Sequence, residues 1–557
     1  MKRIIYSAAI ILIMLQSCQQ KSNVPSKQLV DELKLKRGQL IACGAPGVQL
    51  GEADMKISCS EESRKDFNLG LQLLHSFEYE ESEKVFAKVI DKDPGCAMAY
   101  WGIAMSNFHP LWTAPTQDEL IKGEKAIQIA KTLKATEREA GYIDAIASFY
   151  TNWKMIDHRN RCLSFEKGMK KVYDNNPGDV EAQVFYALAL DAAADPNDKS
   201  FQKQKQAGEI LNALYKKYPN HPGVVHYIIH TYDYPELAQQ GLEAARKYAL
   251  VAPSSAHALH MPSHIFTRLG LWDKCIQSNT QSVNSAKCYA EAAGIKGHWD
   301  EELHGLDYLV YAYLQKAEND SAKMYWDYLK TFTEVQPVNF KVAYAFAAIP
   351  ARYVLENRLW KDAAELKTTP ANFQWGKYPW QEAIIHFARA LGAVHTNNIK
   401  EAEDELQQLN RLHDTLISQK DAYKAGQVAI QAKSAEAWIN LQKGKSTEGL
   451  ALMQDAADME DKTEKHPVTP GEVVPARELL GDMQLQLNKP ADALIAYKAS
   501  LQKHPNRFNG LSGAAMAAEK SGDITTAQSY YAQLMNIAGN TKSNRPELNK
   551  IRSYAKH

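Results

Sequence analysis

Small, aromatic and helix-breaking residues recur every 34 positions in this chain, and that period restricts it to a stacked helical architecture. Near the C-terminus one unit carries Gly481, Ala493, Tyr497 and Pro505. The positions 34 residues later hold Ala515, Ala527, Tyr531 and Gly539, which keep the pattern except that Gly replaces Pro as the helix breaker. A helix hairpin of this length cannot bury its apolar faces alone. Successive hairpins must therefore stack into one continuous core.

The same pattern recurs at the other end of the chain. Gly70, Ser82, Phe86 and Pro94 mark one unit there, and Trp101 continues it one period after Phe67. This spacing resembles that of the tetratricopeptide repeat. Helix-forming residues dominate the composition and β-hairpin signals are absent, so the prediction is an all-α fold, a right-handed superhelical solenoid of antiparallel helix pairs. We expect this solenoid to span residues 61–545, with typical repeats at 474–541 and a tail at 546–557.

The first residues are predicted to lie outside the fold. A short basic start and the apolar stretch Ile4–Leu15 lead to Leu15-Gln16-Ser17-Cys18, which resembles the lipobox of a bacterial lipoprotein. Residues 1–18 are then a signal peptide, Cys18 carries the lipid, and 19–60 form an N-terminal segment. The expected location is the bacterial cell envelope, at a periplasm-facing membrane leaflet and anchored only through that lipid. A plain signal peptide or a membrane anchor are the alternatives.

Export would place the remaining six cysteines in an oxidising compartment, where they can pair. Cys59 and Cys96 flank the first predicted helix pair, and a bond between them would pin the N-terminal segment to the solenoid. We take this pair as the candidate disulfide, although connectivity cannot be derived from sequence.

Charge and motifs exclude several classes of function. Lys and Arg together number 65, as do Asp and Glu together, so the chain lacks the excess of basic residues that is typical of a nucleic-acid binder. No nucleic-acid partner is therefore expected. The phosphate-binding loop G-x-x-x-x-G-K-[ST], the nucleophile elbow G-x-S-x-G and the zinc motif H-E-x-x-H are all missing. Whether the chain is an enzyme stays open.

Histidines concentrate in the central repeats, 221–315. His226 and His230 form an H-x3-H pair, and His260 and His264 form a second pair 34 residues later. Residues four apart share one face of a helix, and a shift of one repeat places the pairs on neighbouring helices. The four imidazoles should therefore face one another on the concave side of the solenoid.

Further residues fall at groove-lining positions of the same repeats. Together with the two pairs they form a candidate metal site for a Zn, Cu or Fe ion. In this site the carboxylate of Asp307 is either a ligand or the group that orients an imidazole. An open coordination position would allow catalysis through a bound water. Pro262 can start or kink a helix between His260 and His264, which puts their alignment in doubt. The candidate ligands are His226, His230, His257, His260, His264, His304 and Asp307.

Other candidates for a ligand-binding groove lie outside the two histidine pairs. His75 and His109 are 34 residues apart at equivalent positions, and Trp101 and Tyr311 fall on the same predicted face. Trp112 follows close behind His109 and extends the aromatic lining. The alternative for the aromatic residues is ordinary repeat packing.

A segment rich in Pro and Gly, from His466 to Gly471, precedes a predicted helix that begins near Arg477. Such a loop either connects two repeats or folds into the groove and brings His466 or Arg477 toward the histidines.

Several longer strings resemble a family of bacterial exported tetratricopeptide proteins that has no established activity. The resemblance covers most of the mature chain and implies the solenoid fold and an envelope location, but no function. The strings are Leu73–Tyr79, Cys96–Gly102, His221–His230, His257–Phe266, His466–Gly471 and Pro475–Gly481.

Two functional hypotheses follow. The first is an envelope binding or scaffold module that holds a protein, a peptide or a small ligand in a histidine-lined concave groove. The second is a metal-binding protein or metal-dependent enzyme that uses the same His and Asp cluster. A purely structural role for the histidines is the third possibility.

Overall fold

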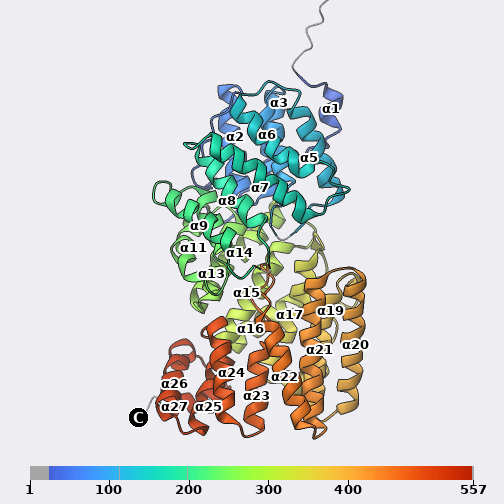
Figure 1. Cartoon of the computed structure of the whole chain (residues 1–557), viewed down its shortest axis with the longest axis vertical. Coiled ribbons are helices and arrows are strands. Elements are labelled where there is room, and N and C mark those ends of the chain that lie inside the picture. Colours follow the sequence, from blue (N-terminus) through green and yellow to red (C-terminus); the bar gives the residue numbers. More distant parts are fainter. Residues whose placement is uncertain (1–23, 112, 197, 555–557) are drawn as a thin grey trace, which may run out of the picture.

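The computed structural model describes residues 24–111, 113–196 and 198–554, and the predicted signal peptide, with Cys18, lies outside them, as does Trp112. The chain forms an all-α solenoid of antiparallel helix pairs, as predicted, with its N-terminal and C-terminal helices at opposite ends of an elongated molecule (Figure 1). Within the described residues, no helix is both long and apolar enough to cross a membrane.

The N-terminal helices are α1 Lys27–Asp31, α2 Glu61–His75, α3 Tyr79–Lys92, α4 Ala97–Ser106, α5 Gln117–Ala130, α6 Glu137–Tyr150, α7 His158–Asn175, α8 Val180–Ala192 and α9 Gln202–Tyr215. The central elements are α10 Pro222–Thr231, α11 Ala238–Val251, α12 Ala256–His260, α13 Pro262–Arg268, α14 Trp272–Ala292, α15 Asp300–Gln315 and α16 Asn319–Leu329, with a short parallel pair of strands, β1 His298–Trp299 and β2 Val335–Gln336. The C-terminal elements are α17 Phe340–Glu356, α18 Trp360–Ala364, the 3₁₀ turn η1 Trp375–Lys377, α19 Pro379–His395, α20 Ile399–Ser418, α21 Ala422–Gln442, α22 Ser446–Asp461, α23 Ala476–Gln486, α24 Pro490–Lys503, α25 Phe508–Lys520, α26 Ile524–Ala538 and α27 Pro546–Tyr554.

The small and aromatic positions of the repeat pack against each other. The Phe86 ring of α3 lies between Gly70 of α2 and Gly102 of α4, where an added Cβ would come within 2.9 and 2.5 Å of the ring. Tyr497 of α24 occupies the same position between Gly481 and Gly513. The aromatic residue of one helix hairpin thus packs against the first helix of its own unit and of the next, which explains why the small residues recur with the repeat.

The solenoid folds back on its central repeats from both sides. At the N-terminal side, Gly223 at the start of α10 lies so close to His75 at the end of α2 that an added Cβ would be 2.4 Å from the imidazole. At the C-terminal side, Trp272 Nε1 donates a hydrogen bond of 2.7 Å to the carbonyl oxygen of Asn506. Distant parts of the chain therefore contact the central repeats from both sides.

The segment before α2 packs along the helices. Its backbone binds the central repeats, where the Gln49 amide donates to Ser254 Oγ at 2.9 Å. A disulfide joins Cys43 to Cys288 of α14. The second disulfide joins the candidate pair, Cys59 and Cys96, and Cys162 and Cys275 stay as buried thiols.

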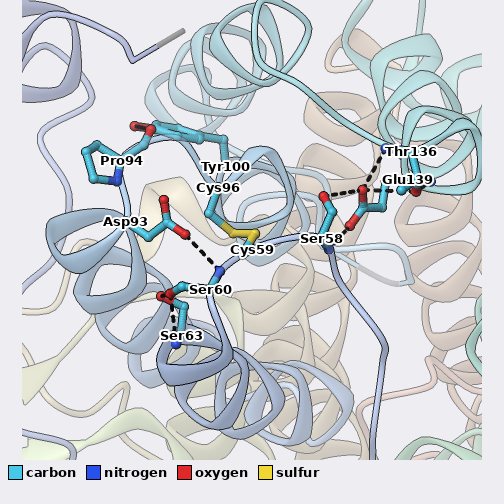
Figure 2. The surroundings of a disulfide bond; sticks show 10 residues. All are labelled: Ser58, Cys59, Ser60, Ser63, Asp93, Pro94, Cys96, Tyr100, Thr136 and Glu139. Atoms are coloured by element: carbon cyan, nitrogen blue, oxygen red, sulfur yellow. Dashed lines mark hydrogen bonds between the residues drawn. A yellow bond between two sulfur atoms is a disulfide. The ribbon is translucent and has the colours of Figure 1, made fainter.

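Hydrogen bonds surround the Cys59–Cys96 bond (Figure 2). The neighbouring Ser58 donates to the Glu139 carboxylate through its amide at 2.6 Å and its hydroxyl at 2.7 Å. The Ser60 amide donates to Asp93 Oδ2 at 3.1 Å. The N-terminal segment is therefore held to the first repeats by covalent and polar contacts.

Candidate metal centre

Four neighbouring helices bring the central histidines together. Helix α10 carries His226 and His230, α12 carries His257 and His260, α13 carries His264, and α15 carries His304. Pro262 is the first residue of α13 and does break the helix there. The break does not separate the second H-x3-H pair, because His260 Nε2 and His264 Nε2 still lie 3.0 Å apart.

The six imidazoles form two groups of three. In the first group, which we call trio A, His226 Nε2 lies 2.9 Å from His230 Nε2 and 3.2 Å from His257 Nε2. The second group, trio B, consists of His260, His264 and His304. Within each trio the possible ligand atoms all lie within 4.8 Å of one another.

Hydrogen bonds on the outer side fix which nitrogens point inward. In trio B, His260 Nδ1 donates to Asn279 Oδ1 at 2.6 Å, and His264 Nδ1 donates to Asp233 Oδ2 at 3.0 Å. The orientation of the Asn279 amide is set because its nitrogen donates to the Cys275 carbonyl at 2.8 Å. With their protons on Nδ1, the neutral forms of His260 and His264 both present lone pairs at Nε2.

Two lone pairs facing each other at 3.0 Å repel unless a cation lies between them. Among the described residues, the other donor near His264 Nε2 is the Tyr308 hydroxyl at 3.5 Å, which is too far for a good hydrogen bond. A tetrahedral metal about 2.0–2.1 Å from each imidazole would hold its ligand nitrogens roughly 3.3 Å apart. The distance of 3.0 Å between His260 Nε2 and His264 Nε2 is close to that value.

In trio A, a hydrogen bond fixes the tautomer of His226 in the same way. Its Nδ1 donates to the carbonyl oxygen of His75 at 2.6 Å, so its Nε2 accepts and faces the Nε2 atoms of His230 and His257. The Phe77 ring covers this trio, with its centroid 4.5 Å from that of His226 and nearly parallel to His230.

Burial keeps the imidazoles neutral. Desolvation, followed by repulsion from neighbouring imidazolium charges, holds the pKa values of His226, His230 and His257 well below the ordinary range. The same causes, in the same order, lower the pKa values of His260 and His304. Neutral imidazole is the form that binds a metal, so no proton has to leave before coordination.

The trios are adjacent and share a cavity. The ring centroids of His230 and His264, one from each trio, are 6.3 Å apart. A cavity of about 240 Å³ is lined by His257 of trio A and by His264 and His304 of trio B.

A third group, His75, Glu181 and His221, also has ligand-like spacing. Here each nitrogen has a complementary partner: His75 Nε2 donates to Glu181 at 2.8 Å and His221 Nε2 donates to it at 2.9 Å. The remaining nitrogens accept, His75 Nδ1 from the Tyr227 hydroxyl at 3.0 Å and His221 Nδ1 from the Val224 amide at 3.3 Å. This group is a satisfied hydrogen-bond network that ties α2 to α8 and α10.

Asp307 does not join either trio. Its carboxylate forms a buried ion pair with Arg352 of α17, and burial raises its pKa to about 6. Asp233, which sequence reasoning did not select, is the carboxylate that orients a histidine. Its position three residues after His230 could have drawn attention to it, but its partners Arg268 and Lys465 are visible only in three dimensions.

The other residues predicted to line the concave groove do not share one site. Trp101 is 1% exposed and packs edge-on against Tyr142, which fits ordinary repeat packing. His109 binds Glu119 at 3.0 Å at the rim of the cavity. Tyr311 accepts a hydrogen bond of 3.0 Å from Arg507.

The Pro- and Gly-rich loop between α22 and α23 enters the inner surface. Lys465 reaches Asp233, and Val468 lines the cavity. His466 packs edge-on against Phe340, outside both trios. Arg477 is partly buried and pairs with two carboxylates of α22 rather than with the histidines.

Comparison with known proteins yields no family assignment. No family model matches the chain, and no curated protein matches it. Among solved structures, the human IFIT1 dimer with PPP-AAAA is similar over 86% of this chain and 91% of that chain, with 12% identity and a TM-score of 0.35. A monomeric IFIT1 mutant with Gppp-AAAA is similar over 92% of this chain and 100% of that chain, with 12% identity and a TM-score of 0.34. Likeness at this level carries no argument about function.

Proposed function

We propose that this protein binds a pair of transition-metal ions, one in each histidine trio. The observation that supports this most strongly is the pair of inward-facing Nε2 acceptors of His260 and His264, 3.0 Å apart in a buried site. The outer hydrogen bonds to Asn279 and Asp233 have the form found behind metal-binding imidazoles, where they fix the tautomer and the ring orientation. Burial of these histidines gives less support to peptide binding in an open groove.

The ligand chemistry narrows the choice of metal. Both trios consist of neutral nitrogen donors, without thiolate or carboxylate. Such sites suit Cu, Zn, Ni and Fe, and disfavour Mg, Ca and Mn, which prefer oxygen. Three protein ligands leave a position open on each ion, as in catalytic rather than structural zinc sites. We expect copper and zinc to bind, with copper the tighter.

We also propose that the protein works in the bacterial cell envelope, anchored through Cys18. The lipobox-like sequence supports this location, and so do the two disulfides, which are typical of oxidising compartments. Mass spectrometry of the mature N-terminal peptide should find Cys18 at its start and lipid-modified. An unmodified, internal Cys18 would contradict the proposal.

Metal content tests the proposed function directly. We expect the mature protein, purified without a histidine tag and loaded with zinc or copper, to retain about two ions per chain after dialysis. His257→Ala should remove the ion of trio A and His304→Ala that of trio B. The double variant should retain none. Elemental analysis by mass spectrometry gives these stoichiometries.

Two matched variants complete the test. His413→Ala removes a partly exposed histidine of α20, and His221→Ala removes one from the satisfied network, so both should keep two ions. Circular dichroism should show unchanged helicity in every variant that is compared. Wild-type protein that takes up no metal, or a double variant that still holds two ions, would exclude the proposal.

A further inference from the structure

Tyr308 of α15 is a fully buried phenol beside trio B. It lies four residues after His304 on the same helix, so the two side chains share one helix face. Its ring contacts every imidazole of the trio, with centroids 4.7 Å from His260, 5.3 Å from His264 and 5.5 Å from His304. The phenol therefore belongs to the same buried cluster as the three imidazoles.

The Tyr308 hydroxyl lacks a good hydrogen bond. Among the described residues, the polar atom that it approaches is His264 Nε2, at 3.5 Å, which is too far for a good hydrogen bond. Burying a hydroxyl in this way costs free energy, and such groups are rare in folded proteins. An ion held by trio B would give the oxygen a strong partner.

We propose that the Tyr308 oxygen is the fourth protein ligand of the ion in trio B, where it binds as a phenolate. This inference rests on the proposed function, because it requires that ion. On binding, the O–H bond of the phenol breaks, the oxygen keeps the electron pair and bonds to the metal through it, and the proton leaves to solvent. The phenolate takes the position that three imidazoles leave open.

The distances within the cluster agree with one ion bound by both kinds of donor. A metal about 2.0–2.1 Å from a nitrogen and about 2.0–2.2 Å from an oxygen holds the two roughly 3.3–3.5 Å apart in a tetrahedral site. The 3.5 Å between the Tyr308 oxygen and His264 Nε2 falls in this range. A distance that is too long for a good hydrogen bond is thus suitable for two ligands of the same ion.

Among the described residues, trio A has no equivalent phenol oxygen. Two tyrosine rings contact His226, but the Tyr227 hydroxyl donates to His75 Nδ1 at 3.0 Å. The Tyr248 ring is nearly parallel to the His226 ring, with centroids 4.9 Å apart. Since the lone pair of Nε2 lies in the plane of its imidazole, a ring stacked on the face does not meet it. The two ions therefore differ, because only the ion of trio B gains an anionic oxygen.

Absorption of the copper(II)-loaded protein tests this inference. Copper(II) bound to a phenolate gives an intense visible charge-transfer band, which copper(II) bound to imidazoles alone does not. We expect the wild type, with two copper ions per chain, to show this band. Tyr308→Phe should reduce its intensity at least tenfold, while elemental analysis still finds two ions per chain. Tyr227→Phe is the matched control, because it removes another buried hydroxyl near the histidines and should leave the band unchanged.

The single-site histidine variants assign the band to one trio. His257→Ala removes the ion of trio A under the proposed function, and it should keep the band. His304→Ala should lose the band together with one ion. The opposite result, a band lost in His257→Ala and kept in His304→Ala, would place the phenolate in trio A and overturn the inference.

Copper content, measured on the same samples, separates this inference from the proposed function. Two bound ions without the band would overturn the Tyr308 ligand and leave the metal pair standing, as would a full band in Tyr308→Phe. A protein that binds no copper would overturn both. If Tyr308→Phe loses an ion, resonance Raman spectroscopy of His257→Ala replaces it. Phenolate ring vibrations, excited within the band, would support the ligand, and their absence would refute it.

Discussion

Asp233→Asn is expected to weaken metal binding in trio B by about 10- to 100-fold, while trio A keeps its ion. The Asp233 carboxylate accepts from His264 Nδ1 at 3.0 Å and from Arg268 Nε at 2.8 Å, and Lys465 lies 3.3 Å away. Although burial alone would raise its pKa, these cations and His264 hold the pKa of Asp233 well below its usual value. Loss of an outer hydrogen bond to a metal-binding histidine typically costs 10- to 100-fold in affinity.

The positive charges left without a partner should weaken metal binding in trio B further. Arg268 and Lys465 are both buried, and without Asp233 they would present two poorly compensated positive charges near a metal cation. Repulsion in a buried site is much stronger than in water. Asp233→Ala, which also removes the hydrogen-bond acceptor, should therefore be at least as severe as Asp233→Asn. Competition titration with a chromophoric zinc chelator would resolve a tight and a weakened site.

Asp307→Asn is the matched control. It alters another buried carboxylate, one that lies on the same helix as His304 and pairs with Arg352 rather than with a histidine. We expect it to lower stability and to leave two ions bound per folded chain. If it instead lost metal as Asp233→Asn does, Asp307 would be part of the centre, as the sequence had indicated, and the geometric assignment of Asp233 would be wrong.

The fold was predictable because its determinants are local and periodic. Gly70 and Phe86 lie within one repeat, and the packing of an aromatic ring against a small residue recurs with the period. The convergence of the two H-x3-H pairs followed from the same period, because residues equivalent in adjacent repeats lie side by side. These relationships require no knowledge of how distant parts of the chain meet.

The division into two trios, and their burial, depend on long-range contacts that periodicity does not specify. His257 sits in the same helix as His260, yet its Nε2 faces His226, because the short helix α12 directs the two side chains to different neighbours. The open groove expected from sequence is covered because the turn after α2 places Phe77 over trio A. Neither contact leaves a trace in spacing or composition.

The buried Arg507, at the junction of the C-terminal and central repeats, should be costly to remove. Arg507 is completely buried and donates to Glu478 at 2.7 and 3.0 Å and to Glu356 at 2.6 Å. These carboxylates belong to α23 and α17, and Arg507 itself immediately precedes α25. One guanidinium thus links three helices from different repeats.

Arg507→Met is expected to lower the free energy of unfolding by about 3–5 kcal/mol, since removing one partner leaves buried charges uncompensated. Arg507→Lys keeps the charge but loses the planar fork that reaches both carboxylates, so its cost should be intermediate. Chemical denaturation followed by circular dichroism would measure both. Arg477→Met is the control, because Arg477 pairs with the partly exposed Asp458 and Asp461, and such pairs contribute at most about 1 kcal/mol. Equal losses for Arg507→Met and Arg477→Met would show that the buried network does not hold the C-terminal repeats in place.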